Sequence, residues 1–392
     1  MSGPSDSVVA GIQTWLLGAR HTDDGGLALM NGLVALLRGF DLPLWRVSFS
    51  LMTKHPELVW HTVQWHEAEG VKRLDRNRRT LDVSYFTASP LPFLQKGEAT
   101  SFRERLAGDA PLRFPICEDL RAHGGSDYFV QALPFSNGQI GYVSWATRAA
   151  GGFDDAWLAA LAGLTPYLAQ RVELESAYHA TRALLEVYLG KNAGDRVVRG
   201  AFRRGDGELI DAAIFFCDLR DFTALSDASP PATVVATLDA YFERVAGAVM
   251  AGGGEVLKFI GDAVLAIFPV AGDAGAACRR ARAAAEDALA AMVALNGERA
   301  ARGEAALGLG IALHVGQLMY GNIGARDRLD FTVISAAVNE TCRLEALCKP
   351  LGAPLTMSGA FVAAAGADDV VDRGEHGLKG VREAIRVFTP RG

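Results

Sequence analysis

Two aspartates beside predicted strands are the residues best suited to do chemistry in this sequence. Asp218 follows the apolar run Ala212 to Cys217, and Asp262 lies in a Gly-Asp turn between two further apolar runs. Alone, a Gly-Asp pair is usually only a turn, and a lone carboxylate beside a buried strand is costly to desolvate. If the strands lie side by side in one sheet, both carboxylates reach one edge. Two hard oxygen ligands with open positions suit Mg²⁺ and phosphate chemistry.

Two other short segments carry candidate polar groups. The run 220–223 leads toward a helix, and free backbone N–H groups at a helix start can hold phosphate oxygens, which makes Phe222 and Thr223 candidate substrate-binding positions. Asn339 and Arg343 are four residues apart and therefore share one face of a predicted helix. Taken alone, such a pair is usually just a polar helix surface.

Three motifs together resemble those of the class III nucleotidyl cyclases. They are FCDLRDFT from Phe216 to Thr223, KFIGD from Lys258 to Asp262, and DFTVISAAVN from Asp330 to Asn339, continued by Arg343-Leu344-Glu345. Each motif is weak by itself, but the three occur in the family's order over residues 190–390. The resemblance implies an adenylate cyclase that converts ATP to 3′,5′-cyclic AMP and pyrophosphate.

The resemblance also implies roles for the motif residues. Asp218 and Asp262 would bind two divalent ions, Mg²⁺ or Mn²⁺, with the Leu219 carbonyl as a further ligand. One ion would activate the ribose 3′-hydroxyl for attack on the α-phosphorus, and the other would neutralise the triphosphate and the leaving pyrophosphate. Asn339 would orient the ribose. Arg343 would offset the charge that grows on the pentavalent phosphorus.

Hydrogen bonding favours adenine as the base. Adenine presents an acceptor at N1 and a donor at N6, and guanine presents the reverse; Lys258 can only donate, and Thr332 can accept. Thr332, not Asp330, lies seven residues before Asn339, which resembles the subclass that uses threonine there, some of whose members respond to bicarbonate. Guanylate cyclase activity remains an alternative, as does a ligand-binding regulator with an inactive cyclase half. The Asn339 helix does not belong to a diguanylate cyclase.

Three further positions bear on the same site. Gly377 to Val381 matches a recurrent hairpin of the family, so Lys379 is a candidate triphosphate contact, with a plain surface lysine as the alternative. Asp221 and Ser335 stand where glycine is common in relatives, and both can weaken nucleotide binding. In the family the metal aspartates and the Asn/Arg pair come from opposite subunits. A chain that holds every role once therefore implies a homodimer with two sites across its interface.

The order of elements in residues 208–392 predicts an α+β fold, the ferredoxin-like βαββαβ arrangement with an antiparallel sheet and helices on one face. The expected strands are Ala212–Cys217, Glu255–Ile260, Ala263–Phe268, Leu307–Val315 and Asp330–Ile334, and the expected helices are 231–250, 273–301 and Ala336–Cys348.

Residues 1–153 resemble a GAF domain, a small-molecule sensor with an antiparallel sheet. Helical spacing marks Gln13–Leu17 and Leu27–Leu37, strand alternation marks Trp45–Leu51 and Val59–Trp65, and Asn137-Gly138 predicts a tight hairpin between Tyr128–Phe135 and Ile140–Ala146. Residues 67–127 are polar and predict loops and short helices. The histidines of this half, His55, His61, His66 and His123, lack ligand spacing, so the sensed effector is not identified.

Residues 154–207 predict a helical connector and transducer between the two domains. Trp157, Leu161, Leu164 and Leu168 follow a 3-4 rhythm that resumes at Leu174 after a slip, which favours a short dimerising coiled coil over a helix packed on its own domain. Pro166 is a position at which the helix can kink or restart.

Composition narrows the class of protein further. The net charge of −6 gives no basic surface for nucleic acid. The chain has no uninterrupted apolar run long enough to cross a membrane, and its N-terminus has the wrong charge order for a signal peptide. Five cysteines without a C-x-x-C pair predict neither disulfides nor a zinc site. These features are typical of a reduced, cytoplasmic protein.

Overall fold

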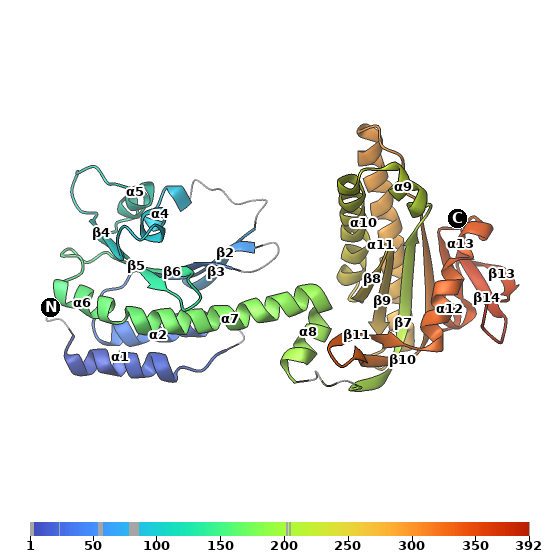
Figure 1. Cartoon of the computed structure of the whole chain (residues 1–392), viewed down its shortest axis with the longest axis horizontal. Helices are drawn as coiled ribbons and strands as arrows, with labels where there is room; N and C mark the ends of the chain where they lie inside the picture. The colour runs from blue at the N-terminus through green and yellow to red at the C-terminus, as the bar shows by residue number, and fades with distance from the viewer. Residues whose placement is uncertain are drawn as a thin grey trace. The chain divides into compact units, whose positions relative to one another are not determined.

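The computed structural model describes residues 4–22, 24–53, 58–77, 86–200, 203 and 205–391, so His55 lies outside the described residues. The chain divides into two compact units, Met1–Leu184 and Leu185–Gly392, each with its own sheet (Figure 1). Among the described residues, no helix is both long enough and apolar enough to span a membrane. All five cysteines are free.

The N-terminal unit is built on a six-stranded antiparallel sheet in the order β3-β2-β1-β6-β5-β4. This confirms the predicted antiparallel sheet, whereas the GAF resemblance stays a prediction. Its elements are α1 (Asp6–Gly18), α2 (Leu27–Gly39), β1 (Arg46–Met52), β2 (Leu58–His66), β3 (Gly70–Asn77), α4 (Leu91–Gln95), β4 (Ser101–Arg105), α5 (Pro115–Ala122), β5 (Asp127–Pro134), β6 (Ile140–Thr147), α6 (Asp155–Gly163) and α7 (Thr165–Leu189).

The two outer strands of this sheet, β3 and β4, are where the sequence prediction was wrong. Both lie inside the stretch 67–127 that was expected to form loops and short helices. Their sequences, GVKRLDRN and SFRER, are rich in charged residues, and each strand is an edge of the sheet that pairs on one side only among the described residues. Charged edge strands discourage pairing with other chains, and they lack the apolar alternation by which strands are predicted.

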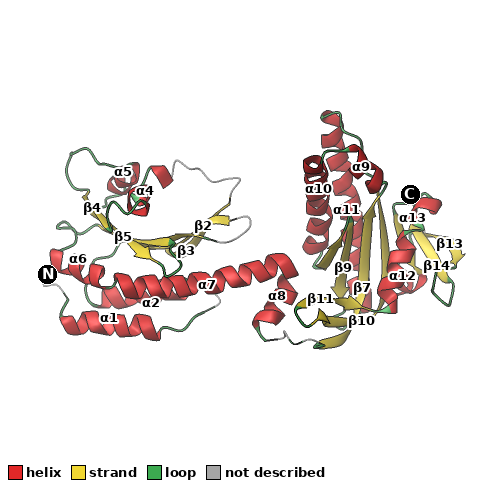
Figure 2. Ribbon diagram, in the orientation of Figure 1, coloured by secondary structure: helices red, strands yellow, loops and turns green. Residues whose placement is uncertain are grey.

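Both faces of the sheet are covered by helices. Leu33, Trp145 and Leu161 belong to the larger core, which packs α1, α2, α6 and the start of α7 on one face. On the other face, Leu94 and Leu120 of α4 and α5 pack against Tyr128 and its neighbours. Figure 2 shows the helices on either side of the strands.

The connector helix belongs partly to the N-terminal core. It restarts at Thr165, next to Pro166, as predicted. Trp157, Leu161, Leu164 and Leu168 are all buried against the N-terminal sheet, so the predicted dimerising stripe is wrong for this half of the connector. These side chains bury the apolar face of the unit's own sheet, so they are not available for a partner helix. Farther along α7, the side chains of Leu174, Tyr178, Val187 and Tyr188 are exposed.

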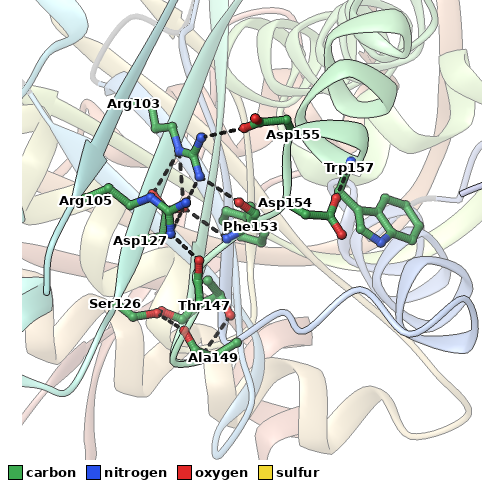
Figure 3. A network of polar contacts seen from close by, with 11 residues as sticks. Arg103, Arg105, Ser126, Asp127, Thr147, Ala149, Phe153, Asp154, Asp155 and Trp157 are labelled. Carbon is green, nitrogen blue, oxygen red and sulfur yellow. Dashed lines mark hydrogen bonds and ion pairs between the residues drawn. The ribbon is translucent and has the colours of Figure 1, made fainter. Parts of the chain in front are cut away.

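A buried ion pair fixes the start of the connector to the sheet (Figure 3). The Asp127 side chain at the start of β5 has no exposed area and accepts a 2.8 Å hydrogen bond from Nη2 of Arg103. The backbone N–H of Phe153, just before α6, donates to the same carboxylate at 3.0 Å. Arg103 in turn donates to the Phe153 carbonyl at 2.6 Å and to the exposed Asp155 carboxylate at 3.3 Å. The β4–β5 pair is thereby tied to α6.

Asp127→Ala should therefore destabilise the N-terminal unit strongly, by about 3–5 kcal/mol, because it removes the buried carboxylate that balances the Arg103 charge and leaves the buried Phe153 N–H without its acceptor. The matched control is Asp155→Ala, which removes the exposed carboxylate from the same arginine and should cost about 1 kcal/mol or less. Urea unfolding followed by circular dichroism measures both. Equal losses in the two variants would contradict this interpretation.

The C-terminal unit contains an eight-stranded mixed sheet in the order β13-β14-β12-β10-β7-β9-β8, with β11 paired to β10. The β10–β12 pair is parallel. The elements are α8 (Lys191–Val198), β7 (Gly207–Leu219), α9 (Phe222–Ala228), α10 (Pro231–Ala251), β8 (Glu255–Ile260), β9 (Ala263–Pro269), α11 (Ala274–Ala301), β10 (Leu309–Ala325), β11 (Arg328–Ile334), α12 (Ala336–Glu345), α13 (Cys348–Leu351), β12 (Leu355–Ser358), α14 (Gly359–Ala365), β13 (Val370–His376) and β14 (Ile385–Pro390).

The α+β class and the predicted order of elements are confirmed, but the helices do not all lie on one face. The central strand β7 is buried on both faces along Ala212 to Cys217. Helices α10, α11 and α14 cover the face that carries Phe215 and Cys217. Residues of α8, α12 and β11 cover the opposite face, which carries Phe216. A strand that is apolar on both faces requires cover on both, and α12 supplies part of the second layer.

Candidate active site

The two predicted metal aspartates lie together at the end of the central strands. Asp218 is the penultimate residue of β7, and Asp262 follows Gly261 in the turn that joins β8 to β9; the left-handed backbone of Gly261 (φ 64°) makes that turn tight. Strands β7 and β9 pair directly, so the turn reaches the end of β7. Burial, the negative charge of Asp262 and a hydrogen bond between the two side chains raise the pKa of Asp218 to about 6.

This carboxylate pair fits a divalent cation. A raised pKa means that the ionised form of Asp218 lacks sufficient positive charge nearby, and a cation between the two carboxylates would supply it. Leu219 directly follows Asp218 as the last residue of β7. Asp218, Asp262 and the Leu219 carbonyl would hold the ions, which bring Lewis-acid activation of a hydroxyl and neutralisation of phosphate charge.

Asp218→Asn should stabilise the metal-free chain at pH 8. A carboxyl whose pKa is raised in the folded state contributes stability below its unfolded pKa, near 4, and loses it as the pH rises through about 6. Removing the charge should thus add about 1 kcal/mol at pH 8, after allowance for solvent screening. The gain should vanish at pH 5 or below as the wild-type carboxyl becomes protonated.

Thermal unfolding with a chelator present measures this difference. Asp221→Asn, three residues farther on, is the control and should change the stability by less than about 0.5 kcal/mol at either pH. A destabilised Asp218→Asn chain at pH 8, or an equal effect at both pH values, would contradict the prediction.

Lys258 points to the face of the sheet that β11 covers. A β-bulge between Val256 and Lys258 of β8 sets this direction, because it places Lys258 opposite Leu265, whose side chain packs on that face. The Lys258 ammonium forms an ion pair with the Asp330 carboxylate of β11. Thr332 is two residues farther along β11 and therefore on the same side of the strand as Asp330. Sequence reasoning set Asp330 aside as out of register and missed this contact.

The phosphate-binding candidates lie at the start of α9. Asp221 precedes this helix in the left-handed conformation (φ 56°), which glycine adopts without strain. Its exposed carboxylate accepts a 3.0 Å hydrogen bond from Lys349. Phe222 packs partly on the core, whereas Thr223 is exposed.

The transition-state candidates lie on α12. Ser335 caps this helix by accepting a 3.1 Å hydrogen bond from the backbone N–H of Val338, a role that glycine cannot fill. Asn339 is exposed and Arg343 half-buried on one side of the helix. The Arg343 guanidinium lies beside Gly380, the neighbour of the exposed Lys379. The structure thus brings Arg343 and the Lys379 loop together.

Arg220 and Glu345 belong to the first and third motifs but received no role from the sequence. In the structure, Nη2 of Arg220 lies 2.9 Å from Oε1 of Glu345, at the end of α12. Burial raises the pKa of Glu345 to about 7; Arg220 opposes this shift, and the charges of Asp218 and Asp262 add to it. The candidate site therefore contains a third carboxylate and an arginine. Sequence reasoning had no signal that would pair them.

Comparison with known proteins identifies the class of this unit. Residues 208–389 match the family model described as the adenylate and guanylate cyclase catalytic domain. The C-terminal unit is therefore a class III nucleotidyl cyclase domain, which confirms the resemblance inferred from the three motifs. Domains of this class generally use divalent metal ions, in keeping with the paired carboxylates.

The matches to two curated relatives cover only part of each relative's length. Adenylate cyclase 1 of Rhizobium meliloti (strain 1021) is 35% identical over 157 residues, 39% of this chain and 23% of the relative. An adenylate cyclase of Anabaena cylindrica is 31% identical over 184 residues, 45% of this chain and 36% of the relative. Among solved structures, the crystal structure of the guanylyl cyclase Cya2 aligns with 28% sequence identity and a TM-score of 0.43. This alignment covers 47% of this chain and 94% of the Cya2 chain. The chain thus spans about a quarter to a third of these curated relatives.

Proposed function

We propose that this protein is a cytoplasmic adenylate cyclase that converts ATP to 3′,5′-cyclic AMP and pyrophosphate. The observation that carries the proposal is the pairing of Asp218 and Asp262. Lys258, on the same β8–β9 hairpin as Asp262, can donate to adenine N1. Two Mg²⁺ or Mn²⁺ ions would activate the ribose 3′-hydroxyl and neutralise the leaving pyrophosphate. The chain's own part is to hold the nucleotide: Lys258 and Thr332 bind the base, and the α9 start, Thr223 included, binds phosphate. Lys379 adds a phosphate contact.

The base contacts predict which nucleotide is used. Purified full-length chain with Mg²⁺ or Mn²⁺ should make cyclic AMP from ATP and far less cyclic GMP from GTP. Lys258→Glu should lower kcat/KM for ATP by about 100-fold, because a carboxylate faces the adenine N1 acceptor without a proton to donate. Lys96→Glu, the same change at an exposed position of the N-terminal unit, should leave the rate unchanged.

Cyclic GMP as the main wild-type product would contradict the adenylate assignment. No product from either nucleotide, with the fold intact, would favour the alternative of a regulator with an inactive cyclase half.

We place the working site between two copies of the chain. Asn339 and Arg343 lie on α12, and Lys379 adjoins Arg343, whereas the carboxylates lie at the β7 end. In each site, one chain would supply the metal-binding aspartates and its partner would supply Asn339 and Arg343. A homodimer would then contain two complete sites, as in the family.

Mixing Asp218→Ala and Arg343→Ala chains should restore activity that neither has alone. Random mixing makes half of the dimers heterodimers with one working site of two, so about a quarter of wild-type activity is expected. Analytical ultracentrifugation checks that both variants remain dimers. An inactive mixture of intact dimers would contradict the shared site.

We further propose that the N-terminal unit binds a small-molecule effector. A cavity of about 240 Å³ lies between its sheet and the α4–α5 side. Its lining includes the hydroxyls of Ser48, Ser50 and Ser144, the Arg46 side chain, and the rings of Trp60 and Tyr142, whose centroids are 6.1 Å apart. Such a lining suits a flat, partly apolar ligand with a hydrogen-bonding or anionic group.

Ser144→Phe should fill this cavity and abolish the binding of a ligand that native mass spectrometry detects on the purified full-length chain. Ser101→Phe places the same side chain on the exposed edge strand β4 and should keep the ligand. A wild-type chain without any bound small molecule, or equal binding by both variants, would contradict the prediction.

A further inference from the structure

Arg220 and Glu345 connect the two halves of the catalytic machinery within one chain. Arg220 lies in the turn just after β7 and pairs with Glu345. Asp218, near the end of β7, faces the same side of the sheet as Phe216. That is the side covered by α12, since Val338 and Cys342 of this helix pack there. Glu345, at spacing i+7 and i+3 from these two residues, lies on the same face of α12. The ion pair therefore joins the metal-binding strand end to the helix that carries Asn339 and Arg343.

Gly310 of the neighbouring strand β10 and Gly308, just before that strand, make room for this pair. A methyl group at Gly310 would overlap both the Arg220 guanidinium and the Glu345 carboxylate. A methyl group at Gly308 would come within 3.2 Å of the Arg220 Cβ. The Arg220 backbone N–H donates to the Gly308 carbonyl at 2.9 Å, which fixes the arginine at the strand end. The guanidinium thus lies against β10 where glycine leaves room for it.

The pair is also largely shielded from water. The Glu345 side chain is 7% exposed and that of Arg220 is 22% exposed. Removing one partner of such a shielded pair leaves an uncompensated charge. The pair therefore links the strand end to the helix through a 2.9 Å charge contact, although Oε1 of Glu345 accepts no hydrogen bond among the described residues.

From these contacts we propose that the Arg220–Glu345 ion pair is a positioning device that couples the two active sites of the dimer. The inference rests on the proposed shared site. There, Asp218 of one chain serves one site, while Asn339 and Arg343 of the same chain serve the other. The ion pair joins these two groups inside each chain. A shift of the metal-binding strand end in one site is thus transmitted to the transition-state helix of the second site.

Heterodimers with one working site test this coupling. An Arg343→Ala chain supplies the aspartates of that site, and an Asp218→Ala chain supplies its α12. Glu345→Gln is added to either chain in turn. Since the pair positions both the strand end and the helix, each placement should lower kcat about tenfold or more, with little change in KM for ATP. Gly310→Ala, which separates the pair without removing a charge, should act in the same way.

The matched control is Glu286→Gln, which breaks an Arg–Glu pair on α11 with a 2.9 Å contact outside the site and should leave kcat unchanged. A loss from only one placement would overturn the coupling, because the pair would then position a single element. Unchanged kcat in both placements, with only a lower melting temperature, would show a purely structural role. If the mixture without Glu345→Gln is already inactive, the shared site itself fails, and the coupling fails with it.

Discussion

Electrostatic repulsion between Asp218 and Asp262 is the constraint on which the catalytic unit depends. Strand β7 is buried on both faces, so it cannot move its end toward solvent to relieve the pair. The tight β8–β9 turn delivers the second carboxylate to the same point. Burial and like charge raise the pKa of Asp218 to about 6, and this cost is tolerable if a cation neutralises the pair during function.

The sequence predicted this arrangement where it follows from local pattern. The apolar run before Asp218 and the Gly-Asp turn were enough to place both carboxylates at one sheet edge. The sequence did not predict contacts made by folding the chain back on itself. The Lys258–Asp330 ion pair depends on a bulge in β8. The Arg220–Glu345 pair depends on Gly310 of β10 and on Gly308 just before that strand. Neither has a spacing rule, because the partners are far apart in the chain.

The N-terminal unit shows the same division. Strands with an apolar face, such as β1 and β6, were predictable, whereas the charged edge strands β3 and β4 were not. The stripe from Trp157 to Leu168 has the period of a dimerising helix, but it covers the unit's own sheet. A 3-4 spacing of apolar residues indicates that one face of a helix is apolar, but it does not indicate which element or partner covers that face.

Strand β5 gives the N-terminal unit a physical link between its cavity and its connector. Tyr128 and Val130 line the cavity on one face. Because side chains alternate along a strand, the buried Gln131 lies on the opposite face of the sheet. Its side-chain amide donates to the Leu161 carbonyl at 3.0 Å and to the Thr165 hydroxyl at 2.9 Å. A ligand that shifts β5 would act on the α6–α7 junction through these bonds.

Calorimetric titration of Mn²⁺ into the metal-free full-length chain tests the central claim most directly. In paired buffers of different ionisation enthalpy at pH 6 and pH 8, the titration reports the protons released on binding. If the cation neutralises the carboxylate pair, binding at pH 6 should release about half a proton from Asp218, and binding at pH 8 almost none. Asp218→Asn should release none at either pH. Equal proton release by wild type at the two pH values, or undiminished Mn²⁺ affinity in Asp218→Asn, would contradict the claim.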